Sequence, residues 1–471
     1  MVVGSVSRGC QVVVIGAGPG GYVAAIRLAQ LGKDVILVEK NPTLGGVCLN
    51  VGCIPSKALI HAADLAHEIR HAGNMGLTVE GLAVDLPKMV EWKDSIVTRL
   101  TTGVEFLCKG NGVDVVSGAA EFLSDRSLAV STDEGRIEIE FEQAVIATGS
   151  QPMQLDGFPF DGEKIIGSTE ALSLQAVPDK LVIIGAGYIG LELGIVYAKL
   201  GSQVSIVEFL PKVVPGLDAE VGKALTRQLK KLGIKLYVSH RAESFETGDP
   251  SVVISRGPKE DELRLEADLV LVTVGRVPNS EGLSLEAAGV ATDDKGFITV
   301  NDRMQTSAPG IYAIGDAVGG ALLAHKAYQE AKVAAEVIAG EPAAFDNVVP
   351  AVIYTDPEVA WVGLGEEEAK EQGYNVITGA FPYKASGRAM SLDATDGFVK
   401  VVADADSKQL LGVVAVGRGV SEFIGEATLA LEMGAFLEDV ALTIHPHPTM
   451  SEALQEAVEV ALGKAVHTVQ S

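Results

Sequence analysis

Two stretches of the chain repeat the same order of apolar and polar positions. Each begins with a short β-branched apolar run, passes through a glycine-rich turn into a segment with helical spacing, stops at a Leu-Gly pair and ends in a second apolar run closed by a glutamate. This order predicts a strand, a helix and a second strand. The stretches are residues 13–40 and 182–209, and they align with each other without a gap. The chain is therefore predicted to contain two copies of one βαβ unit.

The glycine turns of both units have the spacing G-x-G-x-x-G, and their closing acids stand in register. The first glycine permits a tight turn, the second lets the backbone approach a pyrophosphate, and the third allows close helix–strand packing. The helix N-terminus offers amides and a positive dipole to phosphate, and the acid can accept from ribose hydroxyls. One such motif is weak evidence, but two in full context predict two dinucleotide sites. The motif residues are Gly16, Gly18, Gly21 and Glu39 in the first unit and Gly185, Gly187, Gly190 and Glu208 in the second.

The acid of the second unit bears on the choice of nicotinamide cofactor. A carboxylate at Glu208 would repel the 2′-phosphate of NADP, for which an arginine is the usual partner. Residues 208–211 contain no arginine, and Lys212 is the nearest cation. The second site is therefore predicted to take NAD.

Two cysteines follow the first unit. Cys48 and Cys53 stand five residues apart and would diverge on a regular helix, but Gly52 and Pro55 fit an irregular helix start that could bring them within bridging distance. A helix N-terminus and Lys57 would both stabilise a thiolate. We therefore favour a redox-active pair. The alternatives are zinc binding, which would need two further ligands and another spacing, a structural bridge, or spectator thiols.

The composition narrows the class of protein. A chain of 471 residues is long enough for about three domains. The 62 acidic and 37 basic residues give a formal net charge of −25, which argues against a nucleic-acid binder. The acidity serves solubility or docking to a basic partner surface. Four cysteines in so long a chain do not form a disulfide framework, and Cys10 and Cys108 are expected to be buried or inert.

The sequence predicts neither a membrane protein nor a metal site. It has no run of 18 or more apolar residues, and its first residues lack the features of a secretory signal or a Ser/Arg-rich transit peptide. We expect a cytoplasmic location.

The cysteine segment GGVCLNVGCIPSK resembles the active-site stretch of the pyridine nucleotide–disulfide oxidoreductase family, most closely of its members that oxidise dihydrolipoyl groups. The resemblance extends over essentially the whole chain. Further similar segments are Ala147-Thr148-Gly149-Ser150, Gly275-Arg276-Val277-Pro278, Gly315-Asp316, Leu322-Leu323-Ala324-His325-Lys326, residues 351–363 and His445-Pro446-His447-Pro448-Thr449-Met450-Ser451-Glu452.

The resemblance implies an α/β fold with two Rossmann-like dinucleotide-binding domains, one for FAD and one for NAD, and a C-terminal α+β dimerisation domain. The implied domains are residues 1–149 for FAD, 150–276 for NAD, 277–346 as a central region completing the FAD site, and 347–471 for dimerisation.

The resemblance also implies roles for individual residues. Cys53 would lie nearer the flavin and Cys48 would exchange with substrate, while Lys57 and Glu192 would pair beside the flavin's reactive nitrogen. Tyr188 would stack with, or gate, the nicotinamide. The implied FAD-binding set is Gly16, Gly18, Gly21, Glu39, Lys40, Gly46, Cys48, Lys57, Gly118, Thr148, Gly149, Ser150, Asp316, Leu322, Leu323, Ala324 and His325. The implied NAD-binding set is Gly185, Gly187, Tyr188, Ile189, Gly190, Glu192, Glu208, Ala242 and Gly275.

A histidine near the C-terminus completes the implied catalytic set of Cys48, Cys53, Lys57, Glu192, His447 and Glu452. His447 would be the acid–base catalyst and Glu452 would orient it, because imidazole suits proton transfer near neutral pH. Prolines on both sides restrict the backbone of His447, whereas His445 is expected to be a supporting or surface residue. Pro446 replaces the family's commoner small residue but leaves the spacing to Glu452 intact. In this family the histidine reaches the disulfide of the other subunit, which implies an obligate homodimer.

The implied reaction is oxidation of protein-bound dihydrolipoyl groups by NAD⁺ through the cysteine pair and FAD. The implied partner is the lipoyl domain of an acyltransferase or of a glycine-cleavage carrier protein, as in 2-oxoacid dehydrogenase complexes. Mercuric reductases and large thioredoxin reductases use a further C-terminal redox pair, but no cysteine follows Cys108. A glutathione-type disulfide reductase and a redox-sensing interaction component remain alternatives.

Overall fold

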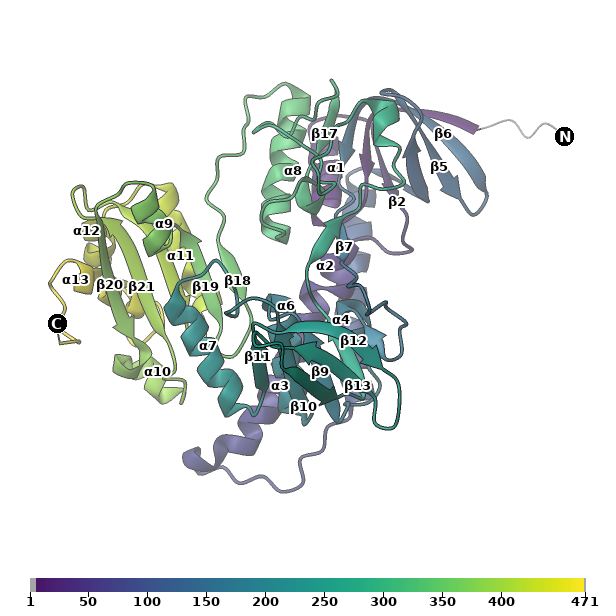
Figure 1. Ribbon diagram of the computed structural model, residues 1–471. Helices are drawn as coiled ribbons and strands as arrows, with labels where there is room; N and C mark the ends of the chain where they lie inside the picture. Colours follow the sequence, from purple (N-terminus) through teal and green to yellow (C-terminus); the bar gives the residue numbers. More distant parts are fainter. Residues whose placement is uncertain (1–5, 470–471) are drawn as a thin grey trace.

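The computed structural model describes residues 6–469, and these form three large sheets with helices packed around them (Figure 1). Two of the sheets contain the parallel strands of the repeated units, and the third is antiparallel and lies in the C-terminal part of the chain. The predicted α/β class is confirmed.

The first sheet has the strand order β3-β2-β1-β6-β5-β4, and β17 pairs with β6. Helix α1 (Pro19–Gln30) begins in the glycine turn and packs against α8 (Ala324–Ala339), so a segment from far along the chain completes this part of the fold. The strands are β1 (Val6–Ile15), β2 (Val35–Glu39), β3 (Asp114–Ser117), β4 (Ala119–Phe122), β5 (Ser127–Thr132), β6 (Gly135–Ile146) and β17 (Ile311–Ala313).

The second sheet repeats this construction in the order β11-β10-β9-β15-β8. Its helix α6 (Tyr188–Leu200) begins at the position that aligns with the start of α1, and β10 (Gln203–Glu208) ends at the position that aligns with the end of β2. The predicted repeat is therefore confirmed element by element. The other elements of this region are β8 (Ile165–Ile166), α5 (Ser168–Ala171), β9 (Lys180–Ile184), α7 (Ala219–Lys231), β11 (Lys235–Val238), β15 (Leu269–Val272) and the three-stranded sheet β12 (Arg241–Glu246), β13 (Val252–Arg256) and β14 (Glu262–Glu266).

A short antiparallel ribbon joins the two regions that contain the predicted dinucleotide-binding units, called below the first and second nucleotide-binding regions. Strand β7 (Ser150–Pro152) leaves the first region and pairs with β16 (Arg276–Pro278), where the chain returns. The returning chain passes through the short helices η2 (Leu285–Ala288) and η3 (Gly315–Val318).

The C-terminal sheet has the order β18-β19-β22-β21-β20 and is antiparallel throughout. Apolar side chains from α11, α12, α13 and the sheet form one core. The elements are β18 (Ala351–Ile353), β19 (Val359–Gly363), α9 (Glu366–Glu371), β20 (Val376–Pro382), η4 (Tyr383–Ala385), α10 (Gly387–Ser391), β21 (Phe398–Asp404), β22 (Leu410–Val416), α11 (Val420–Glu432), α12 (Leu437–Leu442) and α13 (Glu452–Ala461).

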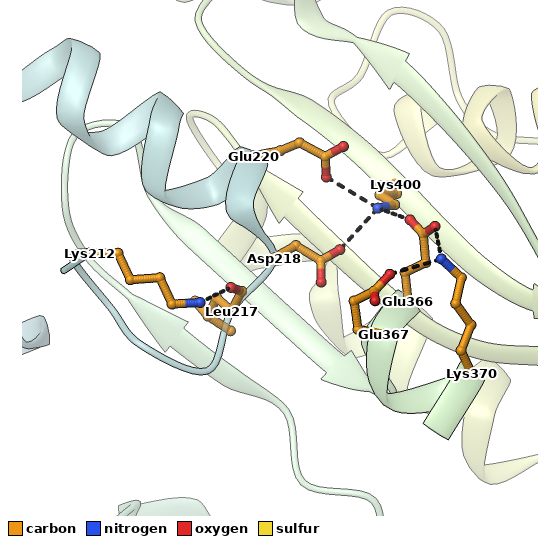
Figure 2. A network of polar contacts seen from close by, with 8 residues as sticks. All are labelled: Lys212, Leu217, Asp218, Glu220, Glu366, Glu367, Lys370 and Lys400. Carbon is orange, nitrogen blue, oxygen red and sulfur yellow. Dashed lines mark hydrogen bonds and ion pairs between the residues drawn. The ribbon is translucent and has the colours of Figure 1, made fainter. Parts of the chain in front are cut away.

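One buried lysine ties this C-terminal sheet to the second nucleotide-binding region. Lys400 Nζ of β21 lies 3.1 Å from Asp218 Oδ2, 3.2 Å from Glu220 Oε2 and 2.6 Å from Glu366 Oε2 (Figure 2). Asp218 and Glu220 stand at the start of α7, so the network bridges two sheets.

The cysteine segment forms α2 (Gly46–Val51) and α3 (Cys53–His71), followed by η1 (Ala72–Met75) and, after a loop, α4 (Leu86–Gly110). By length and composition alone, Gly46–Met75 resembles a membrane-spanning helix. It is interrupted at Gly52, however, and α3 packs between α4 and α6. This helix is therefore part of the protein core.

Candidate active site

A cavity of about 600 Å³ lies between the two nucleotide-binding regions. Its wall is formed in part by residues in or next to both glycine turns and by the cysteine pair. The predicted site residues that line it are Gly16, Gly18, Glu39, Lys40, Gly46, Cys48, Cys53, Lys57, Gly118, Thr148, Gly149, Ser150, Tyr188, Ile189, Glu192, Asp316, Leu322 and Ala324.

The two acids of the repeat hold their glycine turns in the same way. Glu39 accepts hydrogen bonds from the amides of Ala17 at 2.7 Å and Asn41 at 2.8 Å. Glu208 accepts from Ala186 at 2.6 Å and Leu210 at 2.7 Å, and these two donors stand at the aligned positions of the second unit. Both carboxylates are buried. Each acid thus fixes the loop that a ribose would contact.

The third glycine of each motif is required by close packing. A Cβ on Gly21 would lie 1.7 Å from the Gly16 carbonyl oxygen, and one on Gly190 would lie 2.2 Å from the Gly185 oxygen. A Cβ on Gly18, by contrast, would meet only Gly46 Cα, at 3.9 Å. The backbone of the first turn is therefore open towards the cavity, as the close approach of a pyrophosphate requires.

The polar groups on the cavity wall also fit FAD. The hydroxyl of Thr148 is buried on the cavity wall and has no hydrogen-bond partner within the described residues. Buried polar atoms are nearly always satisfied, so a bound group with polar atoms is expected beside it. The open glycine turn, Glu39 and this hydroxyl together match an elongated dinucleotide.

The cysteines lie on either side of a helix break. Cys48 belongs to α2, Gly52 interrupts the helix with φ −144° and ψ −108°, and Cys53 is the first residue of α3. The predicted irregular helix start is thus confirmed. Cys10 and Cys108 are buried, as expected, and lie away from the cavity.

The two thiols of the pair differ in acidity. Hydrogen bonding with Cys48, opposed by burial and assisted by the Lys57 ammonium, lowers the pKa of Cys53 to about 7. The same contact with Cys53, together with burial, raises the pKa of Cys48 well above its ordinary value. Cys53 is exposed because it faces the cavity, although protein surrounds it on its other sides. In the reduced pair Cys53 is therefore the more acidic thiol, and Cys48 is the one that keeps its proton.

A partly buried ion pair stands beside Cys53. Lys57 Nζ lies 2.9 Å from Glu192 Oε2, joining α3 to α6. The other carboxylate oxygen of Glu192 accepts from the Tyr354 amide at 2.8 Å, and Lys57 Nζ lies 4.6 Å above the Tyr354 ring. Tyr354 follows β18 and lies in the 351–363 segment that resembles the family, but the sequence assigned this residue no role of its own.

A second polar chain crosses the ribbon between the two regions. Arg276 donates to the hydroxyl and carbonyl oxygens of Ser150, both at 2.7 Å, and Ser150 Oγ donates to Asp316 Oδ2 at 2.5 Å. Asn279 donates to the Thr148 carbonyl at 2.9 Å. Asp316 is thus linked through Ser150 to both strands of the ribbon. Sequence reasoning assigned no role to Asn279; its place directly after the Gly275–Pro278 segment was the only available signal.

The remaining predicted residues lie outside the cavity wall. His447 Nδ1 lies 2.8 Å from Glu452 Oε1, but the side chain of His447 is 79% exposed and belongs to the C-terminal region of this chain. His445 has a buried side chain that pairs with Glu426 at 2.6 Å, which fits a supporting role. His325 Nε2 contacts the Pro350 carbonyl at 2.6 Å. Gly21, Gly185, Gly187, Gly190, Glu208, Ala242, Gly275 and Leu323 do not line the wall either, and Ala242 lies in β12.

Family models match most of the chain. The model described as pyridine nucleotide-disulphide oxidoreductase matches residues 10–331, and that of the corresponding dimerisation domain matches residues 349–458. The chain belongs to the pyridine nucleotide-disulphide oxidoreductase family. Its C-terminal sheet is thus a dimerisation domain, and the family's members work as flavoproteins with FAD and NAD(H).

Similar members of this family are dihydrolipoyl dehydrogenases. The chain is 49% identical to dihydrolipoyl dehydrogenase 2 of Haloarcula marismortui, over 99% of this chain and all of the relative. It is 48% identical to the dihydrolipoyl dehydrogenase of Halobacterium salinarum and 46% identical to that of Bacillus subtilis, each over the full length of both chains.

Solved structures of the family share this fold. LpdA from Mycobacterium tuberculosis matches with a TM-score of 0.89 and 27% identity, over 95% of this chain and 99% of that one. The flavoprotein disulfide reductase RclA from Escherichia coli, in its Cu(II) complex, matches with a TM-score of 0.86 and 28% identity, over 96% and 99%.

Proposed function

We propose that this chain is a dihydrolipoyl dehydrogenase, which oxidises protein-bound dihydrolipoyl groups with NAD⁺. The observation that carries the proposal is the asymmetric Cys48–Cys53 pair, set beside the Lys57–Glu192 ion pair in a cavity between two dinucleotide-binding units. The full-length relatives named dihydrolipoyl dehydrogenase support this substrate over other disulfides.

The cysteine pair would carry the thiol–disulfide exchange. A dihydrolipoyl thiolate attacks the sulfur of Cys48 in the Cys48–Cys53 disulfide, and Cys53 leaves as a thiolate. The second substrate thiol then displaces Cys48, which takes up a proton, and the substrate departs as the cyclic disulfide. The acidity of Cys53 makes it a good leaving group, since a thiol with a lower pKa leaves faster.

His447 would supply the proton transfer. Glu452 holds Nδ1 of the imidazole and so leaves Nε2 free to accept a proton from the substrate thiol. Because the imidazole is exposed and lies outside its own chain's cavity, we propose that it serves the cavity of the second subunit in a homodimer.

The remaining residues would hold the cofactors. The first glycine turn, Glu39 and the Thr148 hydroxyl would bind FAD, and Lys57 would place positive charge beside its ring. The second glycine turn and Glu208 would bind NAD⁺. When bound, FAD accepts the electron pair of the dithiol and passes it to NAD⁺ as hydride.

The finer assignments of partner, location and domains belong to the same proposal. The partner would be a lipoyl domain of an acyltransferase or glycine-cleavage carrier, and the location the cytoplasm. The domain limits would be residues 1–149, 150–276, 277–346 and 347–471, since β7 and β16 form the crossing between the first two.

Two assays on the purified holoenzyme test this function. Dihydrolipoamide with NAD⁺ should give turnover, whereas oxidised glutathione with NADPH should give little. Turnover in the second assay alone would make the chain a glutathione-type reductase and overturn the proposal.

A further inference from the structure

Helices α3 and α6 are joined by two ion pairs rather than one. The first is the Lys57–Glu192 pair in the cavity, at 2.9 Å. The second lies further along both helices, where Lys199 Nζ is 2.6 Å from Asp64 Oδ1. Asp64 follows Lys57 by seven residues, and Lys199 follows Glu192 by seven. Seven residues are about two helical turns and about 10 Å of rise, so both pairs lie on the facing sides of the helices.

The C-terminal region supports each pair from the same short segment. The amide of Tyr354 donates to Glu192 at 2.8 Å, and Asp356 Oδ2 lies 2.6 Å from Lys199 Nζ. Tyr354 and Asp356 are two residues apart in the loop after β18. The catalytic pair and the distant pair therefore share both helices and one supporting loop.

In the distant pair the lysine is buried, and one positive charge faces two negative charges. Lys199 is 4% exposed, and its single ammonium faces two carboxylates. Burial opposes the charged lysine, but Asp356 and Asp64 outweigh it and hold the pKa of Lys199 above its ordinary value. Burial raises the pKa of Asp64. Without the ammonium, Asp64 and Asp356 would be left facing each other as like charges.

We infer that Lys199 is a positioning residue for the Lys57–Glu192 pair and Cys53, acting through α3, α6 and the Tyr354–Asp356 loop. Without Lys199, repulsion between Asp64 and Asp356 would move this loop away from α3. The hydrogen bond from the Tyr354 amide to Glu192 would then break. The inference rests on the proposed function, because it concerns the same dithiol and flavin.

Lys199→Met in the holoenzyme tests this role. The main readout is the long-wavelength absorbance band of a thiolate beside flavin, measured after addition of two electron equivalents of dithionite. We expect the band to fall by at least half. We also expect kcat for dihydrolipoamide to fall about 10-fold, because small misplacements of reacting groups slow a reaction strongly. The KM for NAD⁺ should change little. Lys199→Arg should restore the band. Since dithionite replaces the substrate, the band reports on Cys53 even if dihydrolipoamide is not the substrate.

Lys400→Met is the matched control. Lys400 is similarly buried, faces three carboxylates and also joins the second nucleotide-binding region to the C-terminal sheet, but its ion pairs involve neither α3 nor α6 (Figure 2). This variant should keep the band. If Lys199→Met fails to fold, Asp356→Asn removes only the loop contact and should lower the band partially. A full band in Lys199→Met or Asp356→Asn, or an equal loss in Lys400→Met, would overturn the inference.

Discussion

At the scale of single residues, the chemistry depends on an asymmetry within one pair of thiols. The two cysteines have the same ordinary acidity, but their shared hydrogen bond and the Lys57 ammonium favour charge on Cys53 and a proton on Cys48. The proposed roles of the two sulfurs, Cys48 for exchange and Cys53 towards the flavin, agree with this difference in environment.

Replacing the exchanging sulfur should separate cofactor binding from turnover. Cys48→Ser cannot form the disulfide, so dihydrolipoamide oxidation should fall by at least about 10³-fold. The serine still fits the wall, and the purified protein should remain yellow with its flavin. Residual activity within about 10-fold of the wild type would show that the disulfide is not on the reaction path.

The acidity of Cys53 predicts a pH dependence of the reduced enzyme. Since the pKa is lowered to about 7, the thiolate is present above this pH and is lost as the pH falls through it. The groups facing Cys53 are Cys48, Lys57 and Glu192. Titration of the reduced holoenzyme, followed at the long-wavelength band, should show a midpoint near pH 7. A midpoint near the ordinary thiol value of about 8.5 would contradict this assignment.

The imidazole should depend on its carboxylate partner. Glu452→Gln removes the negative charge that lies beside Nδ1 of His447 while keeping the shape of the side chain. We expect kcat for dihydrolipoamide to fall about 10²-fold or more, because orienting carboxylates have effects of this size or larger. Glu426→Gln, which alters the His445 contact instead, is the control and should have a much smaller effect.

At the scale of elements, the repeated βαβ unit depends on packing so close that only glycine fits. The carbonyl of the first motif glycine lies against the third in both units, which locks the helix onto the turn. The residue two places after each glutamate donates a hydrogen bond to it. Equivalent sequence positions therefore produce equivalent loops in two different cofactor sites.

Filling this contact should disrupt flavin binding. In Gly21→Ala the new methyl group would overlap the Gly16 oxygen, so α1 or the turn must move at a cost of about 3 kcal/mol or more. The ratio of flavin to protein absorbance after purification should drop strongly. Gly9→Ala lies in β1, before the repeated unit begins, where a Cβ meets nothing within 4 Å, and this variant should retain its flavin. Normal flavin content in Gly21→Ala would refute the packing argument.

At the scale of the whole molecule, three regions of the chain meet at α3. The helix comes from the first region, α6 from the second, and the Tyr354–Asp356 loop from the C-terminal region. The contacts of the Lys57–Glu192 pair therefore depend on how these regions pack together.

The Lys400 network should contribute to stability by joining α7 to the C-terminal sheet, away from α3 and α6. Lys400→Met leaves the largely buried Asp218 without an ammonium partner and leaves the partly buried Glu366 with only the exposed Lys370, whereas Glu220 is half exposed. We expect the free energy of unfolding to fall by about 2 kcal/mol. This is less than the loss expected for a fully buried pair, because water reaches part of the site. Urea unfolding should show a lower midpoint, with Lys370→Met, whose lysine is exposed, as the control. An unchanged midpoint would show that the network contributes nothing to the fold.

The sequence by itself determined the two nucleotide-binding units, the cysteine pair and the break at Gly52. Each of these lies within one short segment, where glycine spacing, helix signals and neighbouring charges act locally and leave a readable pattern. The pairing of Glu452 with His447 also lies within one short segment, because the two residues are five positions apart.

Only the tertiary structure decided which distant groups pair with one another around the cavity. Tyr354 lies 162 residues from Glu192, Lys199 lies 135 from Asp64, and Arg276 lies 126 from Ser150. These contacts depend on the packing of separate regions, and a lysine or aspartate on a helix surface has the same local pattern whether it meets water or a buried partner. The structure likewise placed His447 outside the cavity of its own chain, which the residues around His447 do not encode and only the resemblance to the family implied.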